Sequence, residues 1–313
     1  MIRLIKGKII AILLILFGLI FVPLFLPTYS LNLLTLILIF GIFAASLDLL
    51  VGYTGLYSLG HAAFWGTGAY IIGILSARGL ITNFFLLFLL AIVAVVIVAA
   101  IFGILATKVT GIYFLMITFC FNQVLFVVAW KWRGMTGGDD GIPGISRPNL
   151  GIPWNFGDDL NFYYFCLLFF LAAAWSMYRI TESPFCKALV GIRDSESRMQ
   201  TLGFPTRVFK FLCFVISGLF SGVAGILSVY YNGFVSPMDF SLVLSGEGLI
   251  MNIIGGVGTL WGPMIGAAVI TLLKHLVSGY TVHWPFIVGG IFVLVVMFVR
   301  GGIAGALKEK WKL

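Results

Sequence analysis

The sequence predicts an all-α protein that crosses a membrane several times, and two observations support this fold class. Hydrophobic residues make up 61% of the 313-residue chain and charged residues only 10%, whereas soluble domains carry about 25% charged residues. The charges are also clustered, since residues 31–51 hold one acid and residues 81–107 hold none. This composition excludes a soluble enzyme, a disordered chain and a nucleic-acid-binding domain.

Apolar stretches long enough for membrane-embedded helices recur along the whole chain, because about 20 helical residues cross about 30 Å of hydrocarbon. We expect a polytopic protein with ten membrane-embedded helices, near 9–26, 31–50, 58–77, 81–106, 109–130, 160–180, 207–231, 246–258, 262–279 and 284–300. No small-residue cleavage site follows the first, so we interpret it as a retained helix rather than a signal peptide. Glycine interrupts 58–77 and the pair 246–279, and these segments are also compatible with half-helices or a re-entrant loop.

Two hydrophilic stretches, 131–159 and 181–206, interrupt this pattern. Neither is long enough to build a core of its own, so we expect a single transmembrane domain over residues 1–313. With the N-terminus inside, 14 of the 19 Lys and Arg residues fall on the inner side and 5 on the outer side. The positive-inside rule therefore predicts that both termini and 181–206 are cytoplasmic and that 131–159 is outside.

Motifs for bond-making chemistry are absent from the sequence. It contains no GxxxxGK[ST] phosphate loop, no HExxH, no GxSxG and no metal-ligand spacing, and its four cysteines form no CxxC pair. We therefore expect no catalytic residue, no metal site and no cofactor bound by this chain. If the protein acts on a solute, we expect it to transport the solute rather than to convert it chemically. Any energy from ATP would come from another chain.

The inner segment from Ser183 to Lys210 reads SPFCKALVGIRDSESRMQTLGFPTRVFK. Ser183 followed by Pro184 is typical of a helix start, and Gly203 and Pro205 end the helix. Apolar residues recur between them near helical spacing, namely Phe185, Ala188, Leu189, Ile192, Met199 and Leu202. The pattern predicts one short amphipathic helix, which either rests on lipid or docks on a cytosolic partner.

Four stretches, in order, resemble the branched-chain amino-acid permease family of ABC importers. GYTGLYSLGHAAFWGTGAY (52–70) and GGVGTLWGPMIGAA (255–268) resemble its two glycine-rich signatures, and ALVGIRDSESRMQTLG (188–203) resembles its coupling loop. TGGDDGIPGI (136–145) is similar to the outer-loop signature of the M-type subunit. The resemblance covers about residues 30 to 300. The family usually carries paired small residues after the acid of the coupling loop, where this chain has Ser197 and Met199.

The resemblance implies a permease subunit that translocates leucine, isoleucine and valine across the bacterial or archaeal cytoplasmic (inner) membrane. It implies a second, H-type permease subunit, two cytosolic ATPase subunits that bind ATP and Mg, and a periplasmic or extracellular substrate-binding protein, with lipid around the helices and no nucleic acid. The ATPase-coupling residues that it implies are Ala188, Arg193, Asp194, Glu196, Leu202 and Gly203.

Polar and glycine residues inside the predicted helices are the candidates for the translocation path. A charge at the bilayer centre costs about 2.5–3.5 kcal/mol and must face protein or water. For the glycines the alternative is tight helix packing, and for the polar side chains it is hydrogen bonding between helices or an interfacial position. The candidates are Ser58, Gly60, His61, Asn122, Glu247, Gly255 and Gly256. Asp48 is expected to reach the inner interface.

Three other functions stay open. A urea or short-amide permease would share the same signatures, although the chain lacks the extended termini expected there. An ion-coupled secondary transporter would need a charge pair or a cation site deep in the membrane. A structural membrane scaffold would need only the inner docking helix.

Overall fold

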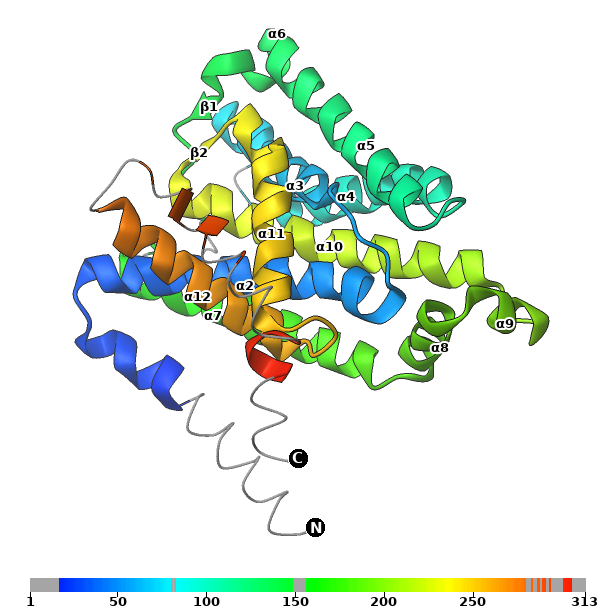
Figure 1. Cartoon of the computed structure of the whole chain (residues 1–313). Coiled ribbons are helices and arrows are strands. Elements are labelled where there is room, and N and C mark those ends of the chain that lie inside the picture. Colours follow the sequence, from blue (N-terminus) through cyan, green and yellow to red (C-terminus); the bar gives the residue numbers. More distant parts are fainter. Residues whose placement is uncertain are drawn as a thin grey trace.

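The computed structural model describes residues 17–148 except 80 and 82, residues 156–279, and positions 283, 286, 287, 289, 290, 293 and 301–305. Helices dominate the described part, which confirms the all-α fold (Figure 1). They are η1 (Val22–Phe25), α2 (Thr28–Thr54), α3 (His61–Ala77), α4 (Phe84–Ala106), α5 (Ile112–Lys131), α6 (Arg133–Thr136), η2 (Gly138–Asp140), α7 (Asp159–Thr181), α8 (Pro184–Asp194), α9 (Glu196–Thr201), α10 (Thr206–Asn232), η3 (Pro237–Phe240), α11 (Leu242–Gly255) and α12 (Trp261–Ser278). Residues 9–16 of the first predicted segment and most of the predicted segment 284–300 lie outside the described residues.

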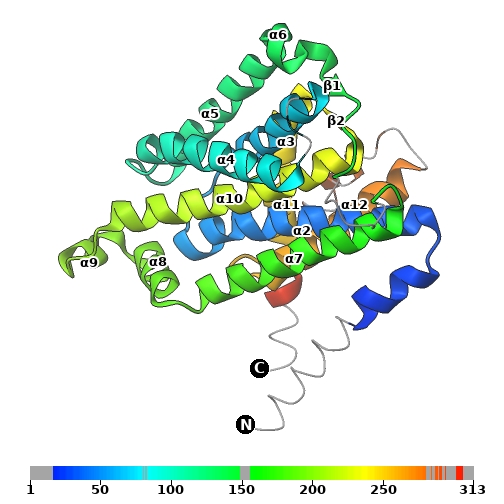
Figure 2. The ribbon, with the colours of Figure 1, turned by 180° about the vertical axis from the view of Figure 1, so that it is seen from behind.

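Two long helices form the centre of the bundle. α2 and α10 have 27 residues each, about 40 Å at 1.5 Å per residue, which exceeds the hydrocarbon thickness. They pack against each other, with α7 and α12 against α2 and with α3 and α4 against α10. Figure 2 shows α7, α2 and α10 running side by side, with α8 and α9 at one end. That end is the predicted cytoplasmic end of the bundle, and the opposite one is the predicted outer end.

Helix α4 shows why the apolar sequence favours a membrane-spanning bundle. The side chain of Asn83 caps its first turn by accepting a hydrogen bond from the N–H of Phe85 at 2.9 Å. The face against its neighbours carries the buried, mostly small residues Ala91, Val95, Ala99 and Gly103. The opposite face exposes the large apolar residues Leu89, Val93, Ile97, Ile101 and Ile104. A helix that is apolar all round is stable only in lipid or inside a larger assembly.

Within the described residues, six helices are long and apolar enough to cross a membrane: α2, α4, α5, α7, α10 and α12. Helix α3 has 17 residues and starts at His61 rather than at the predicted 58. Residues 55–60, which precede it, are not helical. Helix α11 has 14 residues, about 21 Å, which is shorter than the hydrocarbon core. Figure 1 shows it crossing α2 and α10 instead of running beside them. Of the two alternatives for 246–258, a half-helix or a re-entrant loop, the structure thus favours a half-helix, which runs over Leu242–Gly255.

The predicted outer loop is tied back to the bundle by a small sheet. Strands β1 (Ile142–Pro143) and β2 (Phe234–Val235) are antiparallel, with Ile142 opposite Val235. Gly141 precedes β1 at φ +68°, and its missing side chain leaves room for the Phe234 ring and the Val235 carbonyl. The TGGDDGIPGI stretch therefore serves as a turn sequence that joins α6 and η2 to the segment after α10.

Candidate functional site

The segment predicted to couple to an ATPase forms two helices, not the single helix that the sequence predicts. Ser183 caps α8 as expected, since its hydroxyl accepts a hydrogen bond from the N–H of Cys186 at 3.4 Å. Ser195 has extended backbone angles and ends α8. Its hydroxyl then accepts from the N–H of Arg198 and caps α9. A serine in the middle of the segment competes with the helix for backbone hydrogen bonds, which explains the break.

The apolar face of α8 packs against its own chain. Cys186, Ala188, Leu189 and Ile192 are buried, and α8 contacts α2, α7 and α10. Burial raises the pKa of the Cys186 thiol to about 11, with smaller contributions from the Asp48 and Glu182 carboxylates. The surface that α8 and α9 leave exposed is polar, apart from Leu202 and Phe204 after α9.

Two acidic residues of the predicted coupling set lie in different surroundings. The side chain of Asp194 is 65% exposed, and its carboxylate faces the Arg193 guanidinium at 3.4 Å. Glu196 instead accepts a hydrogen bond from the Lys210 ammonium at 2.6 Å and from the Thr206 hydroxyl at 3.1 Å. Because only 3% of the Lys210 side chain is exposed, this ion pair fixes α9 to the start of α10. Gly203 follows with φ +85°, the left-handed conformation expected after a helix.

Arg193 points into the bundle. Its Nη1 donates a hydrogen bond to the backbone carbonyl of Gly52 at 2.5 Å. Gly55 ends α2 in a left-handed conformation with φ +72°, and a Cβ atom there would lie 2.9 Å from the Cγ of Arg193. The first glycine-rich signature thus makes room for an arginine of the coupling segment.

Asp48 lies beside this contact and is fully buried, so the expectation that it reaches the interface is wrong. Its two carboxylate oxygens accept hydrogen bonds from the backbone N–H groups of Gly258 at 2.7 Å and Leu260 at 3.1 Å. Both donors belong to the loop between α11 and α12, where Leu260 has φ +56°. The end of α2, the end of α8 and the loop 256–260 therefore meet at one place, which we call the α2–α8–loop junction.

The path candidates at the start of α3 are engaged within the bundle. Ser58 accepts a hydrogen bond from the N–H of Gly60 at 3.1 Å, and a Cβ atom on Gly60 would lie 2.8 Å from the Thr118 carbonyl oxygen. The Nε2 of buried His61 lies 2.7 Å from the Ser217 hydroxyl. That hydroxyl donates to the Ser46 carbonyl, so His61 Nε2 is the donor of the pair. These contacts join helices α2, α3, α5 and α10.

The remaining candidates also make contacts between elements. Asn122 donates to the carbonyl of Phe240 at 2.7 Å, which links α5 to η3. Gly255 abuts the backbone of Gly262, so no side chain fits there. Gly256 ends α11 with φ +113°, a backbone conformation that glycine adopts more readily than any other residue. Their surroundings fit close helix packing, and their part in a translocation path stays a prediction.

Among the described residues, Glu247 is the one path candidate that lines the cavity beside α11. This cavity of about 320 Å³ lies between α2, α3, the end of α10, η3, α11 and α12. Its lining also includes Trp65, Asp239 and Lys274, which the sequence does not mark as path residues. In the sequence, Lys274 is only one of the outer-side charges. The pairing of Glu247 with Lys274, 27 residues apart, has no periodic signal that could reveal it.

Comparisons with known proteins agree with the architecture. LivM, the high-affinity branched-chain amino acid transport system permease protein of Escherichia coli, is 25% identical over 302 residues, which cover 89% of this chain and 71% of LivM. LivM of Salmonella typhimurium is 25% identical over 308 residues, covering 91% and 72%. LsrC, an autoinducer 2 import system permease protein of an Enterobacter strain, is 25% identical over 154 residues, covering 45% and 42%.

No solved structure gives a significant match to the chain. The family described as "Branched-chain amino acid transport system / permease component" matches residues 29–300. That range includes almost all of the described helices from α2 to α12, together with both glycine-rich signatures and the coupling segment. The chain is therefore a polytopic membrane protein that belongs to the branched-chain amino acid permease family of ABC transporters.

Proposed function

We propose that this chain is the M-type permease subunit of an ATP-driven importer for leucine, isoleucine and valine. The observation that supports this proposal most is the α2–α8–loop junction. There Arg193 of the coupling segment donates to Gly52 of one glycine-rich signature, next to Gly258 of the other. A subunit that turns a movement at its surface into a rearrangement inside the membrane needs such a connection. The LivM relatives, which match about nine-tenths of this chain, support branched-chain amino acids as the solute.

The proposed importer contains a second, H-type permease subunit, two cytosolic ATPase subunits and an external substrate-binding protein. ATP and Mg bind to the ATPase subunits. The surface offered to the ATPase includes Arg193, Asp194 and Leu202, all of which are exposed. Ala188 and Glu196 act from inside, because they hold α8 and α9 against the bundle.

The proposed location is the bacterial inner membrane, with both termini and the α8–α9 end in the cytoplasm. The bias of Lys and Arg residues supports this orientation. The segment that joins α6 to β1 then lies outside, where a substrate-binding protein would dock.

Reconstitution tests the function. The chain is co-expressed with its candidate H-type and ATPase subunits, purified as a complex and placed in proteoliposomes with the binding protein. We expect uptake of labelled leucine that requires ATP, and none from the chain alone. Leucine accumulation by the lone chain under an ion gradient would favour a secondary transporter. Uptake of urea or acetamide in place of leucine would assign the importer to amides.

A further inference from the structure

The cavity beside α11 has the size and the position of a small-molecule site. Its volume of about 320 Å³ falls at the lower end of the range for ligand pockets, roughly 300–1,000 Å³. Lys274 lies four residues before the end of α12 and Asn232 ends α10, so the cavity lies toward the predicted outer end. The residues that line it come from six elements, which lets a movement of α11 or α12 change its shape.

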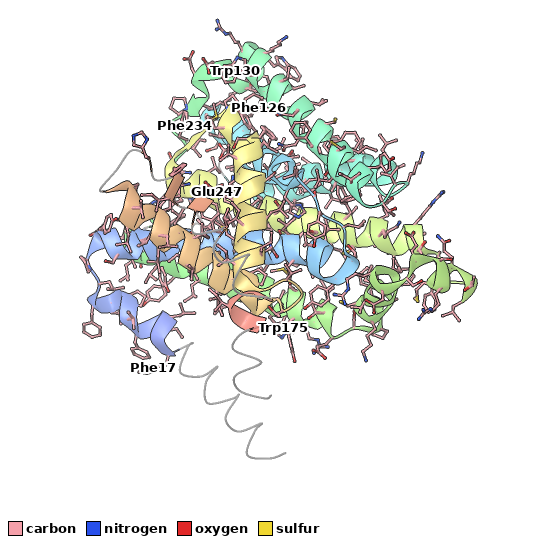
Figure 3. All side chains as sticks on the ribbon, in the orientation of Figure 1. Phe17, Phe126, Trp130, Trp175, Phe234 and Glu247 are labelled. Carbon is pink, nitrogen blue, oxygen red and sulfur yellow. The ribbon has the colours of Figure 1, made fainter. Side chains whose placement is uncertain are left out.

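One wall of the cavity carries an ion pair. The ammonium of Lys274 on α12 lies 2.9 Å from the carboxylate of Glu247 on α11. Their side chains are 35% and 16% exposed, respectively, so both groups are partly shielded. Figure 3 shows Glu247 on the side of α11 that faces α12. Removing these two charges from water costs desolvation free energy, and an ion pair between two helices of a membrane protein therefore points to a functional site.

A second carboxylate lines the same cavity and is held in place. Asp239 of η3 accepts a hydrogen bond from the indole N–H of Trp65 at 3.2 Å and from the backbone N–H of Ser236 at 3.0 Å. The Trp65 ring stacks on Phe40 of α2 with ring centroids 5.5 Å apart. The cavity therefore presents two carboxylates and one ammonium from separate elements.

The rest of the wall is apolar. Leu36 and Phe40 come from α2, Met238 from η3, and Val243 and Leu244 from α11. An apolar wall with a few convergent charged groups is the usual composition of a site for a small amphiphilic ligand.

We propose that this cavity binds a zwitterionic α-amino acid with a branched apolar side chain. The ligand inserts into the ion pair, with its carboxylate on Lys274, its ammonium on Glu247 and Asp239, and its side chain against the apolar wall. Each protein charge keeps an opposite charge beside it, so the exchange avoids an unpaired charge in a shielded place. Urea and amides offer no charges for this exchange, and a simple anion meets two carboxylates. The proposal deepens the proposed function and rests on it.

Uptake by the reconstituted complex tests the ion pair. Glu247→Gln and Lys274→Gln each remove one of the two charges that would contact the ligand, and we expect leucine uptake to fall about 10- to 100-fold, the range for losing a charged hydrogen bond. Asp158→Asn and Lys131→Gln are the matched controls, because both residues are exposed, neither lines the cavity and neither lies between α6 and β1. These controls should transport like the parent complex.

A variant in which Glu247 and Lys274 exchange places distinguishes two roles of the ion pair, ligand binding and structural support. The double variant Glu247→Lys with Lys274→Glu keeps the ion pair and so keeps a purely structural contribution. If the pair binds the ligand, uptake stays low, because Asp239 and the apolar wall are unchanged and favour the original orientation. Full recovery of uptake in the double variant would overturn the proposal.

A binding measurement makes the test independent of transport. In a Cys120→Ser background, which removes the exposed cysteine, Val243→Cys places a thiol at the edge of the cavity. We expect leucine to slow modification of this thiol, whereas leucinamide and 4-methylpentanoate, each lacking one charge, protect at least tenfold less. Equal protection by all three compounds, or by none, would overturn the site. A parent complex that takes up no leucine would instead overturn the proposed function, and protection by leucine would then leave the site standing.

Discussion

Arg193 and Gly52 are 141 residues apart in the chain, yet the arginine guanidinium donates a hydrogen bond to the glycine carbonyl at 2.5 Å. A Cβ atom on Gly52 would lie 2.5 Å from the backbone nitrogen of Gly258. The end of the surface helix α8 thus contacts the end of α2 and, through it, the loop that starts α12. A displacement of α8 cannot leave these two segments unchanged.

Arg193 is expected to act as a connector, not simply as a surface charge. In the reconstituted importer, Arg193→Ala should lower the leucine transported per ATP hydrolysed by about tenfold, the equivalent of one charged hydrogen bond. Arg193→Lys should be intermediate, because an ammonium provides one donor without the planar fork. The control is Arg198→Ala on exposed α9. Equal transport ratios in Arg193→Ala and Arg198→Ala would refute the connection.

Asp48 is expected to contribute to stability through both of its oxygens. Asp48→Ala leaves the N–H groups of Gly258 and Leu260 without their acceptor, at a cost of about 1–3 kcal/mol. Asp48→Asn supplies only one acceptor oxygen and turns an NH₂ group toward the second N–H, so it should also destabilise. Thermal unfolding of the purified chain in detergent measures the effect, with exposed Asp158→Asn as the control. An unchanged Tm in both Asp48 variants would contradict the hydrogen-bonded geometry.

Two glycines with free space around them should respond to alanine in opposite directions. A Cβ atom added to Gly203 or to Gly246 would meet no other atom within 4 Å, but Gly203 has φ +85° and Gly246 lies inside α11. Gly203→Ala forces an L-residue into the left-handed region and should destabilise by about 1 kcal/mol. Gly246→Ala should stabilise by about 0.5–1 kcal/mol. A shift of the same sign in both Tm values would count against the left-handed conformation at Gly203.

The Cys186 thiol should be slow to alkylate and should gain reactivity steeply with pH. Its pKa is raised from 9.0 to about 11, so at pH 8 its thiolate is about 100-fold scarcer than that of an unshifted thiol. The rate of reaction with a maleimide should rise about tenfold per pH unit up to pH 10. Ser197→Cys on exposed α9 is the reference site. If both sites react equally fast at pH 7, the face of α8 that carries Cys186 is not packed against the bundle.

Cysteine labelling in intact cells tests the orientation. An impermeant thiol reagent should modify Asp140→Cys in η2 readily and should modify Ser197→Cys only after the membrane is permeabilised. Both positions are exposed in the structure, so burial does not account for a difference. Ready labelling of Ser197→Cys in intact cells would reverse the proposed topology.

Much of the fold could be predicted because the signals are local. The uncharged run of 81–106 specifies α4 by composition alone, and Ser183, Pro184 and Gly203 mark helix ends by their own backbone chemistry. The ends of α7 and α10 fall within one residue of the prediction. Each of these features depends on neighbours in sequence and not on the rest of the bundle.

The site could be predicted only in part, because its contacts connect residues distant in sequence. Hydropathy finds the apolar stretch of α11 but not its direction across α2. Asp48 reads as an interfacial charge until the loop that it binds, 210 residues away, is placed against it. Glu247 stands out because it interrupts an apolar run, whereas its partner Lys274 lies on a different helix. A serine such as Ser195 can lie within a helix or cap a new one, and its neighbours in sequence do not decide between the two.

The bond between Asp48 and the loop 256–260 has a consequence for how this protein meets its solvent. Hydrocarbon provides no hydrogen bonds to a backbone that leaves its helix, and the turn from α11 to α12 frees several N–H groups at once. The carboxylate of Asp48 stands in for the water that these groups would bind in a soluble protein. A single side chain therefore supplies the hydrogen bonds that water would otherwise supply to this bend. Because that side chain belongs to α2, a movement of the bend relative to α2 would break these hydrogen bonds.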